Sequence, residues 1–158
     1  MQNKKQYFSA LSTLISVFFF WGFIAASNGV FIPFCKTYFK LDQFQSQLID
    51  FAFYGAYYFG ALFIFIYSSR KKNDLINTWG YKYSIVYGLI LSAVGAKIMM
   101  FAVNGEPTNN SFSFILLALF VIGLGFSIQQ TAANPFVIKL GNIKKGSHRL
   151  NLAGGVNS

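Results

Sequence analysis

Acidic residues, cysteine, histidine and proline are all scarce in this chain. Its 158 residues include four Asp and Glu, one Cys, one His and three Pro. A single cysteine, Cys35, excludes an internal disulfide and a metal site built from several cysteines. The remaining candidates for a metal-ligand cluster, or for a nucleophile and its base, are Asp42, Asp50, Asp74, Glu106 and His148. They are too few and too scattered, so we expect neither an enzyme nor a protein with a metal or another cofactor.

Apolar and aromatic residues, in contrast, are far more abundant than in globular proteins. Hydrophobic residues make up 54% of the chain and aromatic residues 20%, whereas charged residues make up 11%. This composition is typical of a membrane protein, in which Phe and Tyr face lipid and anchor the interface. A net charge of +9 would suggest a nucleic-acid partner for a soluble chain. Here the positive charges lie between apolar runs, so we expect the lipid bilayer, and no nucleic acid, as a partner.

Four apolar runs are long enough to cross a hydrocarbon core of ~30 Å as helices rising ~1.5 Å per residue. They cover about 11–34, 48–67, 84–103 and 112–138, and a fifth starts at about 150–158. The sequence therefore predicts an all-α membrane protein with four transmembrane helices and the start of a fifth. A signal peptide is the alternative for the first run, because Lys4 and Lys5 precede it and Ala25-Ala26-Ser27 resembles a cleavage site. The apolar character resumes at Val30 and three more spans follow, which disfavours a signal peptide.

Lysine and arginine lie mostly on one side of these spans. Ten of the thirteen fall on the side of the N-terminus: Lys4, Lys5, Arg70, Lys71, Lys72, Lys82, Lys139, Lys144, Lys145 and Arg149. Lys36 and Lys40 fall on the opposite side, and Lys97 lies within a span. Because cytoplasmic loops carry the excess of positive residues, we expect a multi-pass protein of the plasma membrane with its N-terminus in the cytoplasm.

The end of the fourth apolar run carries two glutamines, an asparagine and a proline: Gln129, Gln130, Asn134 and Pro135. Hydrocarbon tolerates such groups only where protein or a water-filled cavity receives them. On a helix, one face would hold Gly123, Ser127, Gln130 and Asn134. Amide side chains donate and accept hydrogen bonds together, which suits a neutral polyhydroxylated ligand. The alternative is that these amides only bond neighbouring helices.

Asn28 is a further polar residue, in the outer half of the first apolar run, where Gly29 follows it. We interpret it as facing the same cavity as Gln130, or else as part of a fraying helix end. The candidate residues for contacts with a polyhydroxylated ligand are therefore Asn28, Gln129, Gln130 and Asn134.

Asp50 is the only carboxylate close to an apolar run, at the start of the second span. A carboxylate in the first turn of a helix is favoured by the helix dipole and can reach interfacial water, which gives it a structural interpretation. The functional interpretation is a proton or cation site. Lys97, in the outer half of the third span, either extends outwards to the interface or pairs with Asp50.

Six short motifs follow one another along the chain: Phe20-Trp21-Gly22-Phe23, Ser27-Asn28-Gly29-Val30-Phe31-Ile32-Pro33, Phe53-Tyr54-Gly55-Ala56-Tyr57, Gly80-Tyr81-Lys82, Thr131-Ala132-Ala133-Asn134-Pro135-Phe136 and Arg149-Leu150-Asn151-Leu152-Ala153. Their order resembles that in the sugar-transporting branch of the major facilitator superfamily, which includes the fucose permease and the bacterial glucose/galactose transporters. The resemblance covers nearly the whole chain. Its most specific part is the Ala-Ala-Asn-Pro-Phe stretch followed by Arg-Leu-Asn-Leu-Ala.

This resemblance implies a bundle of twelve helices in two six-helix halves around a central site, with residues 1–158 as an incomplete N-terminal half. It implies secondary active transport of a hexose or deoxyhexose, of the fucose, glucose or galactose type, by sugar:proton symport across a bacterial inner membrane. Expected partners are the sugar, a proton or sodium ion, and the remaining transporter helices. The alternatives are a truncated, non-transporting membrane polypeptide or interaction protein, and a drug exporter of the same superfamily.

The chain departs from this family at the positions of the family's carboxylates. Gly29 stands where fucose-permease-like members carry an aspartate, and Gln130 stands where they carry a glutamate. Gln130 is shared with the glucose/galactose members, and Gly154 stands where related sequences have a glutamine. Neither glycine nor an amide can titrate, so Asp50 is the candidate left for proton coupling.

Overall fold

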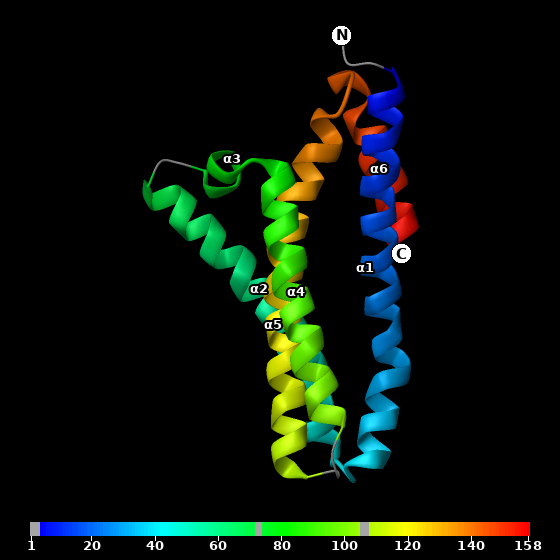
Figure 1. Ribbon diagram of the computed structural model, residues 1–158, viewed down its shortest axis with the longest axis vertical. Coiled ribbons are helices and arrows are strands. Elements are labelled where there is room, and N and C mark those ends of the chain that lie inside the picture. The colour runs from blue at the N-terminus through cyan, green and yellow to red at the C-terminus, as the bar shows by residue number, and fades with distance from the viewer. Residues whose placement is uncertain (1–3, 72–73, 105–107) are drawn as a thin grey trace. The chain divides into compact units, whose positions relative to one another are not determined.

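The computed structural model describes residues 4–71, 74–104 and 108–158; Lys72 and Glu106 of the sequence analysis lie outside these ranges. Its elements are α1 (Lys4–Tyr38), α2 (Gln43–Lys71), α3 (Leu75–Trp79), α4 (Tyr81–Val103), α5 (Asn109–Lys139), the 3-10 helix η1 (Ile143–Lys145) and α6 (Gly146–Asn157) (Figure 1). No strand occurs in the described residues. Four helices, α1, α2, α4 and α5, are long and apolar enough to cross a membrane. The predicted all-α membrane class is therefore confirmed.

The four long helices extend beyond the apolar runs from which they were predicted. The 35 residues of α1, for example, extend about 52 Å at ~1.5 Å per residue, against a hydrocarbon core of ~30 Å. The extra turns are polar or aromatic, because hydrogen bonding within a helix continues wherever the sequence permits it. α6 likewise starts at Gly146, one turn before the fifth run expected from residue 150.

The basic segment between the second and third spans contains the short helix α3, which no apolar run of the sequence predicts. The side chain of Asp74 accepts a hydrogen bond from the backbone N–H of Ile76 at 3.0 Å and so begins the helix. Gly80 ends it with φ +83°, a conformation that favours glycine. A single turn with a cap at each end is too short to show a hydrophobic period in the sequence.

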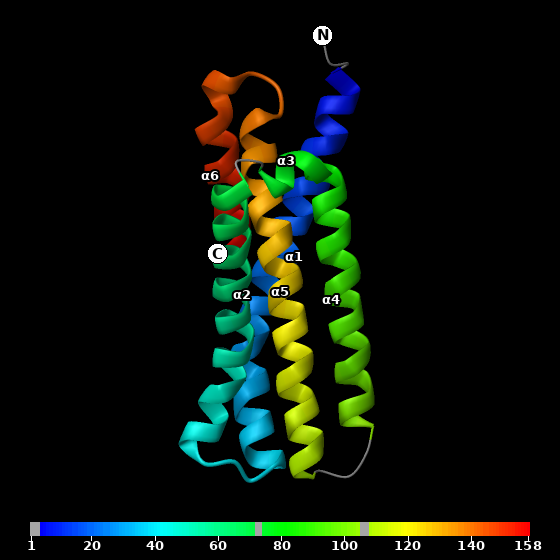
Figure 2. The ribbon, with the colours of Figure 1, turned by 90° about the vertical axis from the view of Figure 1, so that its left-hand side faces the viewer.

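The chain divides into two compact units, whose boundaries fall inside α1 and α5. The central unit is Asn28–Ala132, and the terminal unit consists of Met1–Ser27 and Ala133–Ser158. Within the central unit, α5 runs between α2 and α4 (Figure 2).

Glycines allow α5 to approach both of its neighbours closely. On the α4 side, a Cβ added to Gly88 would lie 2.6 Å from the carbonyl oxygen of Gly125. On the α2 side, a Cβ added to Gly60 would lie 2.8 Å from Ser127 Oγ, and one added to Gly123 would meet the backbone of Phe53. Contacts of backbone against backbone through small residues are how helices associate in lipid, where burial of apolar surface supplies no driving force.

Within the terminal unit, α6 is joined to the end of α5 by Arg149, a charged residue that is only 4% exposed. Its Nε donates to the carbonyl oxygen of Val137 at 3.0 Å and its Nη2 to that of Ile138 at 2.7 Å. Both carbonyls belong to the last turn of α5, where no intrahelical donor reaches them. Gly141, with φ +78° and no room for a side chain beside the ring of Tyr7, makes the turn that returns α6 towards α5.

Candidate functional site

Gln129 lies at the contact of α5 with α4 and its side chain is fully buried. Its Nε2 donates to Ser92 Oγ at 3.0 Å and to the carbonyl oxygen of Gly125 at 3.2 Å. Ser92 Oγ in turn donates to the carbonyl oxygen of Gly88 at 2.9 Å. This amide bonds a neighbouring helix, which is the alternative interpretation that the sequence left open.

Gln130 follows directly but presents its side chain in another direction, because successive residues of a helix point about 100° apart. It is partly exposed, and among the described residues its amide has no hydrogen-bond partner. Asn134 lies one turn further along α5, in the terminal unit, and is also partly exposed without a partner in the described part of the chain. Each of these two amides keeps its donors and its acceptor available.

The first half of the predicted polar face of α5 is covered by α2. Gly123 packs against Ala56, and Ser127 is fully buried against Gly60. Ser127 Oγ has no hydrogen-bond partner within the described residues. The polar face predicted from Gly123 to Asn134 therefore has two parts. Its first part, at Gly123 and Ser127, is a contact with α2, and only its second part, at Gln130 and Asn134, is partly exposed.

Asn28 and Asp50 are brought together from α1 and α2. Asn28 Nδ2 donates to Asp50 Oδ1 at 3.3 Å. Asn28 is buried, with 9% of its surface exposed, whereas Asp50 is partly exposed. The contact joins an amide that can donate and accept with a carboxylate that can take up a proton.

Lys97 does not pair with Asp50. It is exposed on α4, and no ion pair is found for either side chain among the residues that the structure describes. The partner of Asp50 comes from α1 instead, which the sequence spacing of 22 residues between Asn28 and Asp50 does not reveal. The paired alternative for Lys97 is therefore wrong.

Two glycines at positions where the resemblance implies polar side chains face open space. A Cβ added to Gly29 or to Gly154 would meet no atom within 4 Å. Each glycine lies on the regular part of its helix, so no backbone conformation requires it there. Glycine at these positions leaves volume next to Asn28 in one case and on α6 in the other.

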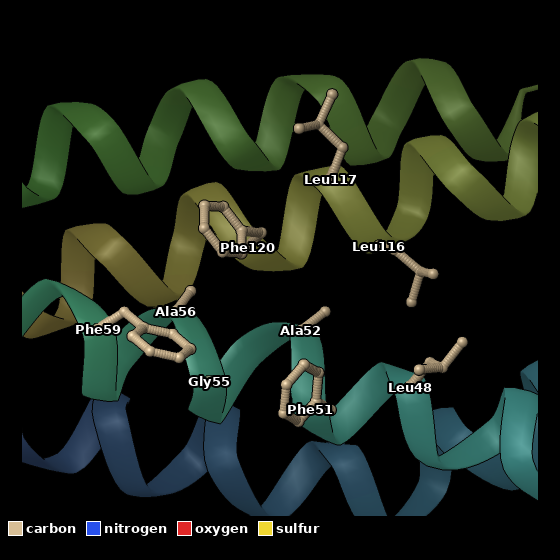
Figure 3. A pocket seen from close by; sticks show the side chains of 9 residues that line it. All are labelled: Leu48, Phe51, Ala52, Gly55, Ala56, Phe59, Leu116, Leu117 and Phe120. Carbon is tan, nitrogen blue, oxygen red and sulfur yellow. The ribbon is translucent and has the colours of Figure 1, made fainter.

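An apolar groove runs along α2 and α5 in the central unit, with a volume of about 310 Å³ (Figure 3). Its lining consists of Leu48, Phe51, Ala52, Gly55, Ala56, Phe59, Leu116, Leu117 and Phe120. None of these side chains can hydrogen-bond to a hydroxyl group. The groove is thus suited to hydrocarbon or to another apolar helix and is not a site for a polar solute.

Among the described residues, no group of three or more His, Cys, Asp or Glu could hold a metal ion. The polar groups that could engage a ligand are amides and one carboxylate. Their chemistry is recognition by hydrogen bonding, and Asp50 is the carboxylate among them that can also carry a proton.

Comparison with known proteins finds transporters. The chain is 37% identical over 156 residues to a glucose/galactose transporter of Brucella abortus, an alignment that covers 99% of the chain and 35% of the relative. It is 35% identical over 156 residues to the L-fucose-proton symporter of Escherichia coli, covering 99% of the chain and 33% of the relative. The L-fucose-proton symporter of Haemophilus influenzae is 27% identical over 150 residues, with 95% and 32% covered. No protein-family profile and no solved structure matches the chain.

These relatives are sugar transporters of the major facilitator superfamily, so the resemblance stated from the sequence motifs is confirmed. The chain spans about a third of the length of the curated relatives that it matches. The relatives are transporters rather than enzymes. Together with the four apolar helices, they identify a multi-pass membrane protein.

Proposed function

We propose that this chain, a relative of bacterial sugar transporters of the major facilitator superfamily, is part of a secondary active transporter for a hexose or deoxyhexose. The observation that carries the proposal is the 37% and 35% identity, over 99% of the chain, to transporters named for glucose/galactose and for L-fucose with a proton. Because the chain spans about a third of those relatives, transport is assigned to the assembly that contains it. In this proposal the chain lies in the plasma membrane, which in bacteria is the inner membrane.

The sugar contacts in this proposal come from Asn28, Gln130 and Asn134, with Gln129 beside them. Gln130 is the best supported of these, since it is partly exposed on a membrane-spanning helix and has no partner in the described part of the chain. A sugar hydroxyl both donates and accepts, as an amide does, and would supply the missing bonds. Gln129 would contribute only after releasing Ser92, so its first role is to hold α5 against α4.

Asp50 carries the co-transported proton in this proposal, with sodium as the alternative ion. Gly29 and Gln130 occupy the positions at which the resemblance places carboxylates, and neither can be protonated. Asp50 is the only carboxylate within the apolar helices of the described residues, and it lies against a buried amide. Polar and ionisable groups at membrane depth are costly and are retained mainly for such roles.

The proposed orientation places the N-terminus in the cytoplasm. Ten of the thirteen Lys and Arg then lie on the cytoplasmic side, as the positive-inside rule requires. Further helices of the transporter would complete the pathway, because a central site needs two facing bundles. They would also cover the unpartnered amides of Gln130 and Asn134, which would each cost on the order of several kcal/mol in hydrocarbon.

Uptake of labelled glucose, galactose and fucose tests this function, in cells that lack their own carriers for these sugars and express the complete reading frame. Saturable uptake of one of them is the expected result. Energy-dependent loss of a lipophilic cation, without sugar uptake, would instead identify a drug exporter. Absence of both, with the protein present in the membrane, would leave the non-transporting polypeptide or interaction protein.

The role of Gln130 is tested separately by Gln130→Ala in the same cells. The apparent KM for the sugar should rise more than the membrane content of the protein falls. Equal losses of transport and of membrane content would mean that Gln130 is structural.

A further inference from the structure

The contact between Asn28 and Asp50 lies near the edge of the hydrocarbon core. The 29 residues of α2 extend about 43 Å at ~1.5 Å per residue, so a centred helix protrudes about 6 Å on each side of a ~30 Å core. Asp50 is the eighth residue of α2, about 10 Å from its start. It therefore sits a few ångströms inside the boundary, close enough to water to exchange a proton and deep enough for its charge to be costly.

Asn28 is the only side chain that the structure brings into hydrogen-bonding distance of Asp50 in the described residues. Lys36, the nearest cation on α1, donates from its Nζ to Gln43 Oε1 at 2.7 Å. Tyr54, one turn further along α2, is exposed, and so is Lys97 on α4. The carboxylate is thus held by a neutral amide, without a fixed positive charge that would keep it ionised.

We propose that Asn28 is the positioning residue of Asp50, and that the hydrogen bond between them couples protonation of Asp50 to the contact between α1 and α2. This proposal deepens the proposed function. Only the link between Asp50 and sugar transport rests on that function; the Asn28–Asp50 coupling itself does not. The amide can have this role because it lies where α1 contacts α2. A change in its hydrogen bond therefore alters the contact between two membrane-spanning helices.

The chemistry of the two groups provides the coupling. An ionised carboxylate only accepts hydrogen bonds, and Asn28 Nδ2 donates to it. Protonation forms an O–H bond on one Asp50 oxygen, and this hydroxyl can donate to the Oδ1 of the same amide. When the proton leaves to water the O–H bond breaks and the first arrangement returns. An amide can form a hydrogen bond with Asp50 in both protonation states because it both donates and accepts. An alkyl side chain can form none.

The residue that follows Asn28 on α1 leaves one side of the helix open. Gly29 follows Asn28 on α1 and no atom lies within 4 Å of where its Cβ would be. Gly29 is exposed, and successive helix residues point about 100° apart, so this open side of α1 lies next to the Asn28–Asp50 contact. Local changes in charge act on a protein by shifting an element between two arrangements, and in this proposal that element is the α1–α2 contact.

Infrared difference spectra between low and high pH test the proposal without reference to any sugar. The sample is the protein from its complete reading frame, reconstituted in lipid vesicles. A carboxyl C=O stretching band should appear on acidification, disappear in Asp50→Asn and shift in frequency in Asn28→Ala. Asp42→Asn is the matched control, since Asp42 is exposed, caps α2 through the backbone N–H of Gln45, and can be replaced there by asparagine. A band unchanged in Asp50→Asn, or unshifted in Asn28→Ala, would overturn the proposal.

Exchanging the two side chains guards against a variant that merely fails to fold. The double variant Asn28→Asp with Asp50→Asn keeps one carboxyl and one amide on the same two helices. It should restore the carboxyl band that Asp50→Asn loses. A double variant that is folded, by its circular dichroism, yet lacks the band would contradict the assignment.

Transport then links the contact to sugar. Asp50→Asn should lose accumulation driven by a proton gradient but retain exchange of sugar across the vesicle membrane, and the exchanged pair should regain part of the accumulation. Full accumulation by Asp50→Asn would refute the proposal while leaving sugar transport intact. Vesicles of the unmodified protein that show the carboxyl band but neither accumulation nor exchange would refute the proposed function and leave the Asn28–Asp50 contact as a protonation site.

Discussion

Two of the polar contacts between helices in the central unit are built differently. At the α4–α5 contact, Gln129 is fully buried, donates to Ser92 and to a backbone carbonyl, and lies where Gly88 and Gly125 bring the two backbones together. At the α1–α2 contact, Asn28 makes one longer bond, of 3.3 Å, to the partly exposed Asp50.

The difference shows that an amide side chain can fix one helix contact rigidly, at α4–α5, and allow another to change, at α1–α2. Gln129 and its acceptors are neutral and surrounded by close backbone contacts, so no proton and no ligand can alter their bonding without separating two helices. Asn28 faces a group that can change its charge and that has access to water. The α4–α5 contact is therefore expected to tolerate change poorly, and the α1–α2 contact to tolerate it well.

The largest effect is expected at the close approach of α4 to α5. In Gly88→Val the new Cβ would lie 2.6 Å from the carbonyl oxygen of Gly125, and backbone cannot yield as a flexible side chain does. Overpacking of this kind costs about 1–3 kcal/mol or more. The midpoint of thermal unfolding in detergent should fall strongly, or the folded protein should be lost. Gly154→Val, at a glycine with open space around it, is the control; equal losses in both variants would show that the contact is not specially tight.

A smaller effect is expected from Gln129→Leu, which removes the amide and keeps most of the volume. Interhelical hydrogen bonds in membranes contribute on average about 0.6 kcal/mol, so the unfolding midpoint should fall modestly. Gln130→Leu is the neighbouring control, because Gln130 has no partner within the described residues. It should leave the midpoint nearly unchanged while raising the KM for sugar. A larger loss of stability in Gln130→Leu would reverse the roles assigned to the two glutamines.

A still smaller loss of stability is expected from Asn28→Ala. Asp50 is partly exposed and can exchange the lost hydrogen bond for water, so the free energy of unfolding should fall by about 0.5 kcal/mol, the low end for one hydrogen bond. Its main consequence should be on proton-driven accumulation. Thermal unfolding and transport measured on the same preparation check this; a fall in stability as large as that of Gly88→Val would show that the α1–α2 contact is structural.

The smallest effect is expected from Gly29→Asp, which places a second carboxylate beside Asn28. A side chain fits at this position without contact, so the free energy of unfolding should stay within about 0.5 kcal/mol of that of the original protein. In the background Asp50→Asn, this substitution should return part of the proton-driven accumulation. Gly29→Asn, of the same size but unable to titrate, is the matched control and should not.

The sequence predicted the parts of this molecule that depend on composition and on long periods. Four apolar runs gave four helices, and the motifs from Phe20 to Ala153 pointed to the sugar transporters that the comparisons then found. The short helix α3 was not predicted, because the only local signals for it are the cap at Asp74 and the turn at Gly80.

The contacts of individual polar residues could not be predicted in the same way. Gln129 and Gln130 are adjacent and chemically identical, and only the position of α4 decides which of them is buried. The partner of Asp50 depends on how α1 and α2 pack, which no local pattern encodes; the sequence offered only Lys97 as a partner, and the structure places Asn28 there instead.

The contact of Arg149 with the end of α5 also has a consequence for the order in which the chain is made. The carbonyls of Val137 and Ile138 are synthesised more than ten residues before the guanidinium group that donates to them. On the ribosome, the last turn of α5 therefore emerges with these oxygens unbound and depends on water or headgroups until residue 149 follows. Closure of this end is thus a delayed step of biosynthesis, and a nascent chain that has left the ribosome as far as the end of α5, with residue 149 still inside, would present an open helix end to the insertion machinery.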